Sequence, residues 1–186
     1  GSEMCIRDRC TARMNLGINP FGFGWKLEPG EEFQTPEAIL VYSDEGLDGM
    51  SQIYHQLYRR RLCRGKYRDI ERPILVNSWE AAYFDFNEQS ILKLAKEAKN
   101  VGIELLVLDD GWFGKRDDDN SSLGDWVVNR KKLPDGLNGL GQKIHSLGLK
   151  FGVWFEPEMV SENSNLYRAH PDWCLHIKGR NHTKGR

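Results

Sequence analysis

From residue 74 onward the sequence alternates short, wholly apolar segments with amphipathic segments of helical period, and this alternation limits the fold more than any other feature. The expected strands are 74–76, 104–108, 150–155 and 173–177. Strands that are apolar on both faces are typical of a parallel sheet with both faces covered. Repeats of roughly 30–45 residues suit a (β/α)8 barrel or a doubly wound sheet. Neither GxGxxG after the first strand nor GxxxxGK[ST] is present, which disfavours nucleotide binding.

Three helices are predicted between these strands. The first spans 88–101, with Asn87 as its N-cap and Gly102 after its end. The second opens at Asp135 and ends before Gly148, and the third spans 162–170. The order of elements is therefore β-α-β-α-β-α-β.

The residues before 73 do not show this alternation of apolar strands and amphipathic helices. Residues 1–10 fit nothing around them and are interpreted as a possible non-native leader, with a ragged edge strand as the alternative. Residues 11–43 read as the C-terminal strands of a β-sandwich domain, including a buried strand at 38–42. Residues 44–72 are predicted to be a linker helix, capped by Ser43 or Asp44, and a domain boundary. Residues 73–186 then form the first half of the barrel, because they supply fewer than half of the roughly 250 residues that a complete barrel needs.

Charge and composition exclude several classes of function. The formal net charge of −1 gives no case for nucleic-acid binding, and the basic stretch 59–68 is read as a solvated helix end. No apolar run is long enough to span a membrane. No signal peptide is visible, so a cytoplasmic location is expected. No metal is expected, because the cysteines and histidines match no zinc spacing and the acidic run 117–120 lacks the glycine and glutamate of an EF-hand loop.

Carboxylates and tryptophans follow each of the first three expected strands, where the active site of a parallel barrel lies. The residues at these three strand ends are Asn77, Trp79 and Glu80, then Asp109, Asp110 and Trp112, and then Trp154, Glu156 and Glu158. An indole offers a face for the apolar side of a pyranose, and an ionised carboxylate accepts hydrogen bonds from its hydroxyls. The pattern therefore indicates a sugar site.

Simpler interpretations remain for each residue. A tryptophan at a strand end is often part of the core, and an Asp-Asp pair often caps a loop. On chemistry alone Glu156 and Glu158 are a candidate acid/base pair of a retaining glycosidase, although Pro157 between them argues for a turn.

Several ordered motifs resemble the α-galactosidases of glycoside hydrolase family thirty-six, in a form similar to the bacterial enzymes. The resemblance covers about residues 14–186. Its motifs are NSWEA at 77–81, LDDGWFG at 108–114, LGDW at 123–126, GVWFEPEMV at 152–160 and HPDW at 170–173. The runs GINP at 17–20 and WKLEPGE at 25–31 also resemble the end of that family's N-terminal β-domain.

The resemblance implies a retaining hydrolase of terminal α-galactosides such as melibiose and raffinose, without a cofactor and with a homo-tetramer as its assembly. Its nucleophile lies in a Lys-Trp-Asp motif and its acid/base is a later aspartate. Neither occurs in this sequence, so we expect no catalytic residue here and no activity from the chain alone. By resemblance, the substrate-binding residues are Trp79, Asp109, Asp110, Trp154 and Arg186.

Three alternatives stay open. The first is a non-catalytic galactoside-binding module that uses the same tryptophans and aspartates. The second is a galactosyltransferase relative of the raffinose and stachyose synthase type. The third is an unrelated barrel enzyme that uses Glu156 and Glu158.

Overall fold

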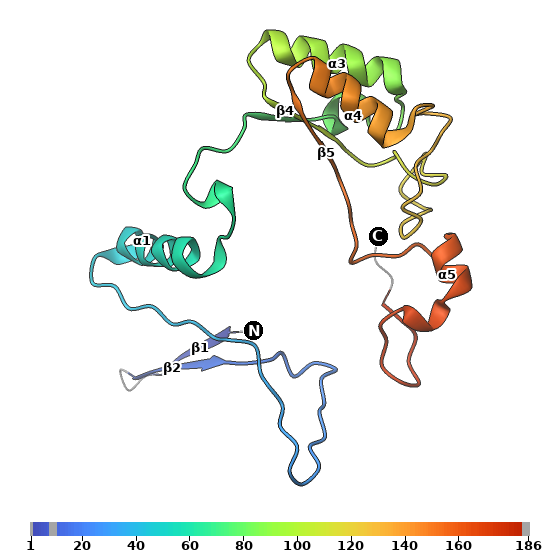
Figure 1. Ribbon diagram of the computed structural model, residues 1–186. Coiled ribbons are helices and arrows are strands. Elements are labelled where there is room, and N and C mark those ends of the chain that lie inside the picture. The colour runs from blue at the N-terminus through green and yellow to red at the C-terminus, as the bar shows by residue number, and fades with distance from the viewer. Residues whose placement is uncertain (1, 8–10, 184–186) are drawn as a thin grey trace. The chain divides into compact units, whose positions relative to one another are not determined.

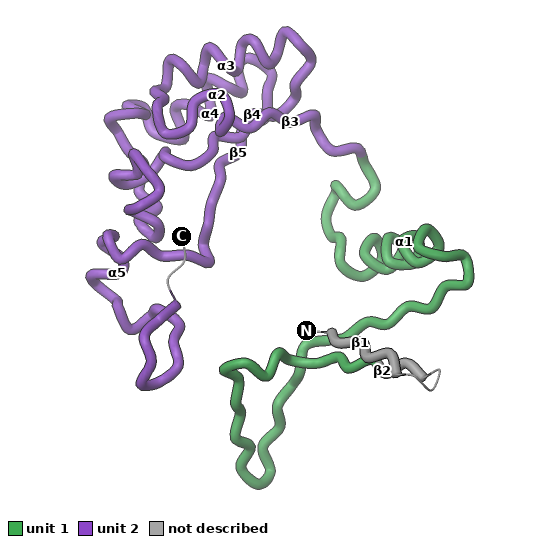
Figure 2. The backbone as a smooth tube through the Cα atoms, turned by 180° about the vertical axis from the view of Figure 1, so that it is seen from behind, with its two compact units in different colours: residues 1–70 green, residues 71–186 purple. Residues whose placement is uncertain are grey.

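The computed structural model describes residues 2–7 and 11–183. The chain divides into two compact units, residues 1–70 and residues 71–186 (Figure 2). No helix within the described ranges is long and apolar enough to cross a membrane.

The first unit contains a β-hairpin and a helix. Strand β1 (Ser2–Arg7) pairs antiparallel with β2 (Thr11–Leu16). This pairing does not test whether residues 1–10 are a non-native leader, which stays a prediction. Helix α1 (Gly46–Leu57) continues as the π-helix η1 (Tyr58–Leu62), and the short 3₁₀-helix η2 (Lys66–Arg68) follows.

Two expectations for this unit are wrong. Residues 38–42 form no strand, and Leu40 and Tyr42 are exposed, because no neighbouring strand among the described residues takes up their backbone hydrogen bonds. Neither Ser43 nor Asp44 caps α1. Glu45 holds the N-cap position without a side-chain cap, and the Ser43 hydroxyl accepts from the Glu45 amide at 3.2 Å instead.

The second unit is built on a three-stranded parallel sheet in the order β3-β4-β5. Its strands are β3 (Leu75–Asn77), β4 (Leu105–Leu108) and β5 (Lys150–Val153). Figure 1 labels β4 and β5, and Figure 2 labels all three strands. Helices α3 (Glu88–Asn100) and α4 (Gly136–Ser146) connect them, and the two helices pack against each other and against the sheet. The β-α-β-α-β order and the parallel sheet are thus confirmed.

The core lies between the sheet and these helices. It follows the apolar stripes that the sequence predicts on α3 and α4, whose residues Ile91, Ala95, Leu140 and Ile144 are almost fully buried. The other buried members are Phe86, Leu106, Leu108, Trp112, Phe113, Leu123, Leu133 and Leu149. The helix α3 begins where predicted, because Asn87 and Ser90 form a reciprocal capping box.

The C-terminal part of this unit departs from the prediction. Helix α5 (Asn165–Ala169) is shorter than expected and is capped by Ser164, whose hydroxyl accepts from the Tyr167 amide. The fourth strand expected at 173–177 is wrong. Pro171–Trp173 forms the 3₁₀-helix η3, and Leu175 beyond it is 94% exposed, with no strand beside it in the described chain.

Candidate functional site

The carboxyl ends of the three parallel strands bring the predicted site residues to one edge of the sheet. The pairing continues one residue past the strands, because the Ser78 amide donates to the Val107 carbonyl at 3.0 Å and the Trp154 amide to the Leu108 carbonyl at 2.9 Å. The residues that follow β3, β4 and β5 therefore start side by side.

Hydrogen bonds join the first two of these strand ends. The Asn77 side-chain amide donates to Asp109 Oδ2, and the Trp79 backbone amide donates to Asn77 Oδ1 at 2.7 Å. The buried hydroxyl of Ser78 accepts from the Asp109 amide at 3.0 Å, and Asp109 Oδ1 accepts from the Asp110 amide at 2.6 Å. This network fixes the half-buried Asp109 against β3.

The second aspartate has a different environment. Asp110 is 6% exposed, and its carboxylate receives the Arg116 guanidinium from the side, with Nε 3.0 Å from Oδ1 and Nη2 2.8 Å from Oδ2. The Gly111 amide donates to Oδ1 at 2.7 Å. The buried charge is therefore paired, as burial of an ionised group requires.

Two basic residues that the sequence reading did not single out hold this arrangement. Arg116 also donates from Nη1 to the Ser121 carbonyl at 2.8 Å. Lys132 Nζ donates to the carbonyls of Phe84 and Arg116, at 2.9 and 3.1 Å, and forms an ion pair with Asp117 at 2.9 Å. In the sequence Arg116 stands beside an acidic run that is typical of a solvated loop, so its burial could not be predicted from its neighbours. The one signal was Asp110, six residues earlier, because a buried carboxylate needs a partner of opposite charge.

The tryptophans at the strand ends differ in burial. Trp112 is 2% exposed, and its indole Nε1 donates to the Trp154 carbonyl at 3.0 Å, so it belongs to the core. Trp79 and Trp154 are both partly exposed at the strand ends. Both indoles therefore retain some accessible surface, and their use as sugar platforms stays a prediction.

Trp79 lies in a short helix that the sequence reading missed, α2 (Trp79–Ala82). Tyr83 ends it at φ 46° and ψ −126°, a conformation that is costly for a residue with a side chain. The rings of Tyr83 and Phe84 meet the Trp79 ring edge-on, with centroids 5.1 and 5.0 Å away. The Tyr83 hydroxyl donates to Glu80, which raises the pKa of that phenol.

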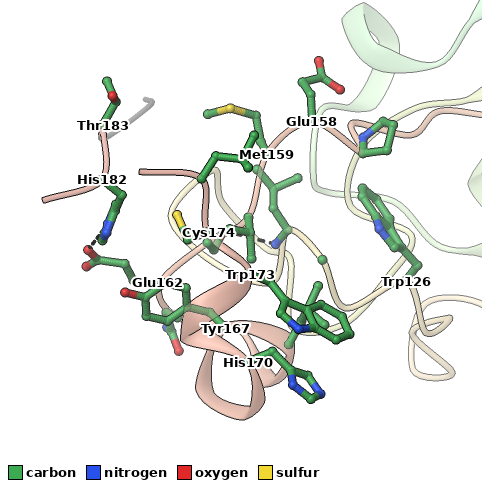
Figure 3. A pocket seen from close by; sticks show the side chains of 18 of the residues that line it. Trp126, Glu158, Met159, Glu162, Tyr167, His170, Trp173, Cys174, His182 and Thr183 are labelled. Atoms are coloured by element: carbon green, nitrogen blue, oxygen red, sulfur yellow. Dashed lines mark hydrogen bonds and ion pairs between the residues drawn. The ribbon is translucent and has the colours of Figure 1, made fainter. Parts of the chain in front are cut away.

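The candidate acid/base pair after β5 is separated by a turn, as Pro157 predicts. Strand β5 ends at Val153, and residues 157–158 form the turn. Glu158 lines a pocket of about 810 Å³ between the segments 119–126 and 157–183. Trp126, Tyr167 and Trp173 line the same pocket (Figure 3). Neither Asp109 nor Asp110 lines this pocket.

Four of the five predicted substrate-binding residues, Trp79, Asp109, Asp110 and Trp154, therefore follow neighbouring strand ends at one edge of the sheet. The fifth, Arg186, lies outside the described residues. Their roles toward a sugar stay predictions. Within the described part of the chain, no three His, Cys, Asp or Glu side chains gather as a metal site would require.

Known proteins match this chain over nearly its whole length. The alpha-galactosidase AgaA of Geobacillus stearothermophilus is 66% identical over 176 residues, which are 95% of this chain and 24% of that protein. The alpha-galactosidase Mel36A of Lactobacillus acidophilus is 58% identical over 90% of this chain and 23% of its own length. The chain thus spans about a quarter of these relatives.

Solved structures agree with the sequence matches. A variant of AgaA in complex with 1-deoxygalactonojirimycin matches with a TM-score of 0.91 and 62% identity, over 99% of this chain and 26% of that one. Another AgaA variant, in complex with raffinose, matches with a TM-score of 0.89 and 63% identity over 98% of this chain and 25% of that one. The family model that matches is Melibiase, over residues 32–186. By sequence and structure, this chain belongs to the melibiase family.

Proposed function

We propose that this chain is part of a retaining α-galactosidase that hydrolyses terminal α-galactosyl residues of sugars such as melibiose and raffinose. It contributes one wall of the galactose pocket, at the carboxyl ends of β3, β4 and β5. The catalytic nucleophile and acid/base belong to other parts of such an enzyme, because the chain has no Lys-Trp-Asp motif. No cofactor takes part.

The observation that carries the proposal is the set of fixed hydrogen-bond acceptors beside partly exposed indoles. Asp109 and Asp110 are held in place by protein donors, and Trp79 and Trp154 stand at the neighbouring strand ends. Sugar hydroxyls need directional acceptors, and a site built to bond a hydroxyl rejects analogues that lack it. The relatives support the same chemistry, since AgaA variants have been solved with raffinose and with stachyose.

The architecture we propose for the parent protein follows from the same resemblance. Residues 73–186 form the first half of a (β/α)8 barrel, 44–72 the linker and 11–43 the end of a β-sandwich domain. The parent enzyme is a cytoplasmic homo-tetramer.

A chimera tests the activity. The 176 matched residues of this chain replace the aligned segment of Geobacillus AgaA, and hydrolysis of p-nitrophenyl α-galactoside and raffinose is followed. We expect turnover by the chimera, and a loss of at least 100-fold in kcat/KM on Asp109→Asn, because a hydroxyl of the substrate then meets a group that also donates. A folded chimera without turnover contradicts the proposal.

The isolated 186-residue chain separates this proposal from the binding-module alternative. We expect neither nitrophenol release nor measurable heat when galactose or melibiose is titrated into the chain. Tight binding in calorimetry would favour a complete binding module, and nitrophenol release would place the catalytic groups within this sequence. Transfer of galactose to sucrose rather than to water by the chimera would favour the synthase-type relative.

A further inference from the structure

Asp110 is expected to bind substrate, yet its side chain is almost fully buried in an ion pair with Arg116. Such burial is unusual for a residue that binds a ligand. The side chains of Arg116 and Asp110 are 4% and 8% exposed. A buried ion pair is weak evidence for stability, since well-packed apolar residues of similar volume often stabilise a fold equally well. The charge therefore calls for another explanation.

We propose that Arg116 is a positioning residue for galactose recognition, which holds the carboxylate of Asp110 in the one orientation that accepts a sugar hydroxyl. The proposal rests on the proposed function and deepens it. Arg116 touches no substrate and acts only through Asp110.

The geometry leaves Asp110 little freedom and one open position. Arg116 Nε lies 3.0 Å from Oδ1 and 3.1 Å from Oδ2, and Nη2 lies 2.8 Å from Oδ2, while the Gly111 amide takes a further position on Oδ1. A carboxylate offers about four lone-pair positions. Because the Nε–H group is shared between the two oxygens, three N–H groups of the described residues serve these four positions, and one position is left for a further donor. Rotation of the carboxylate to any other plane breaks the contacts with Arg116.

Arg116 is itself anchored on several sides. Nη1 donates to the Ser121 carbonyl at 2.8 Å, and the guanidinium carbon lies 5.7 Å from the centroid of the Phe84 ring. Lys132 holds the Arg116 carbonyl at 3.1 Å. A guanidinium is planar and matches a carboxylate with several parallel donors, whereas a lysine ammonium is a point charge that fixes no plane. Arg116→Lys therefore keeps the charge and removes the orientation.

The test uses the AgaA chimera and three substrates: p-nitrophenyl α-galactoside and its 4-deoxy and 6-deoxy analogues. For Arg116→Lys we expect kcat/KM toward the galactoside to fall roughly 10- to 100-fold, because a misplaced contact group costs about this much. The fall should come mainly from KM. Toward the analogue that lacks the hydroxyl bound by Asp110, the same variant should lose less than about 3-fold. Arg168→Lys, an exposed arginine that bonds Asn163 and Asn165, is the matched control and should change nothing.

Each result decides the matter. An equal loss on all three substrates, or no loss on the galactoside, overturns the proposal, because a merely structural arginine cannot distinguish the analogues. If Arg116→Lys does not fold, the double variant Asp110→Asn with Arg116→Gln carries no buried charge, and an equal loss on all three substrates then overturns the proposal, because Asp110 would bind no sugar hydroxyl for Arg116 to serve. An unaltered chimera that folds without any turnover would instead overturn the proposed function, and this inference with it.

Discussion

Leu140→Ala tests whether α4 packs tightly against the sheet, because this packing holds the strand ends at which the candidate site lies. Leu140 is 0% exposed in the core of the second unit. The change removes three carbon atoms from each molecule, which at about 0.8 kcal/mol each gives roughly 2.4 kcal/mol of lost transfer free energy. The cavity left behind raises the expected cost to about 3–4 kcal/mol. Since alanine is the better helix former, none of this loss comes from helix propensity.

The assay is urea unfolding of the chain followed by tryptophan fluorescence, in which the buried Trp112 reports on the second unit. With a slope of about 1.5–2 kcal/mol per molar urea, the midpoint should fall by about 2 M. Leu175→Ala is the matched control, because Leu175 is 94% exposed in the same unit, and its midpoint should stay unchanged. Equal shifts for the two variants would refute the layered packing from which the site is derived.

Three further predictions concern the elements around the site. Asn87→Ala removes half of the capping box of α3 and should lower the free energy of unfolding by about 1 kcal/mol in urea unfolding. Asn100→Ala is the control, because Asn100 is exposed at the other end of α3, and it should change this free energy little. Gly111→Ala should abolish turnover by the chimera, because φ is +95° there and an added Cβ would lie 3.1 Å from the Phe84 ring. The hydrogen bond of Lys143 to Asp135 lowers the pKa of Asp135 below its ordinary 3.8 and raises the pKa of Lys143 above 10.5. The stabilisation by this pair is therefore present between these values, and it is lost as the pH falls through the lowered pKa or rises through the raised one. In Asp135→Asn the loss on the acid side should vanish from the pH dependence of unfolding, whereas part of the loss on the alkaline side should persist, because Glu88 also bonds Lys143.

The periodicity of the sequence was sufficient to predict the sheet and the two long helices. Helix α3 was predicted from local signals, and the structure shows each of them. Its apolar stripe is buried, Asn87 forms the N-terminal capping box, and Gly102 after its end has a φ of 89°. The apolar runs at 38–42 and 173–177 carry the same local signal but form no strand. A strand needs a partner for its backbone hydrogen bonds, and periodicity does not reveal whether that partner is present.

The candidate site was predictable in its strand-end residues but not in what holds them. Asp109 and Asp110 follow an apolar strand, and this position alone marks them. Arg116 lies in a loop of charged residues, and such a loop gives no local sign that one of its side chains is buried. Its role depends on the loop folding back so that the guanidinium reaches Asp110 under Phe84, which is a tertiary contact.

The sheet has one further consequence, for the way the protein is made. Its spatial order β3-β4-β5 is also the order of synthesis. At roughly 5–20 residues per second, each strand leaves the ribosome a few seconds after the one it pairs with. Every new strand therefore adds beside its immediate predecessor, and none has to be inserted between two strands already paired. The contact of Asn77 with Asp109 joins the ends of the first two of these strands, so it requires no strand that is synthesised later.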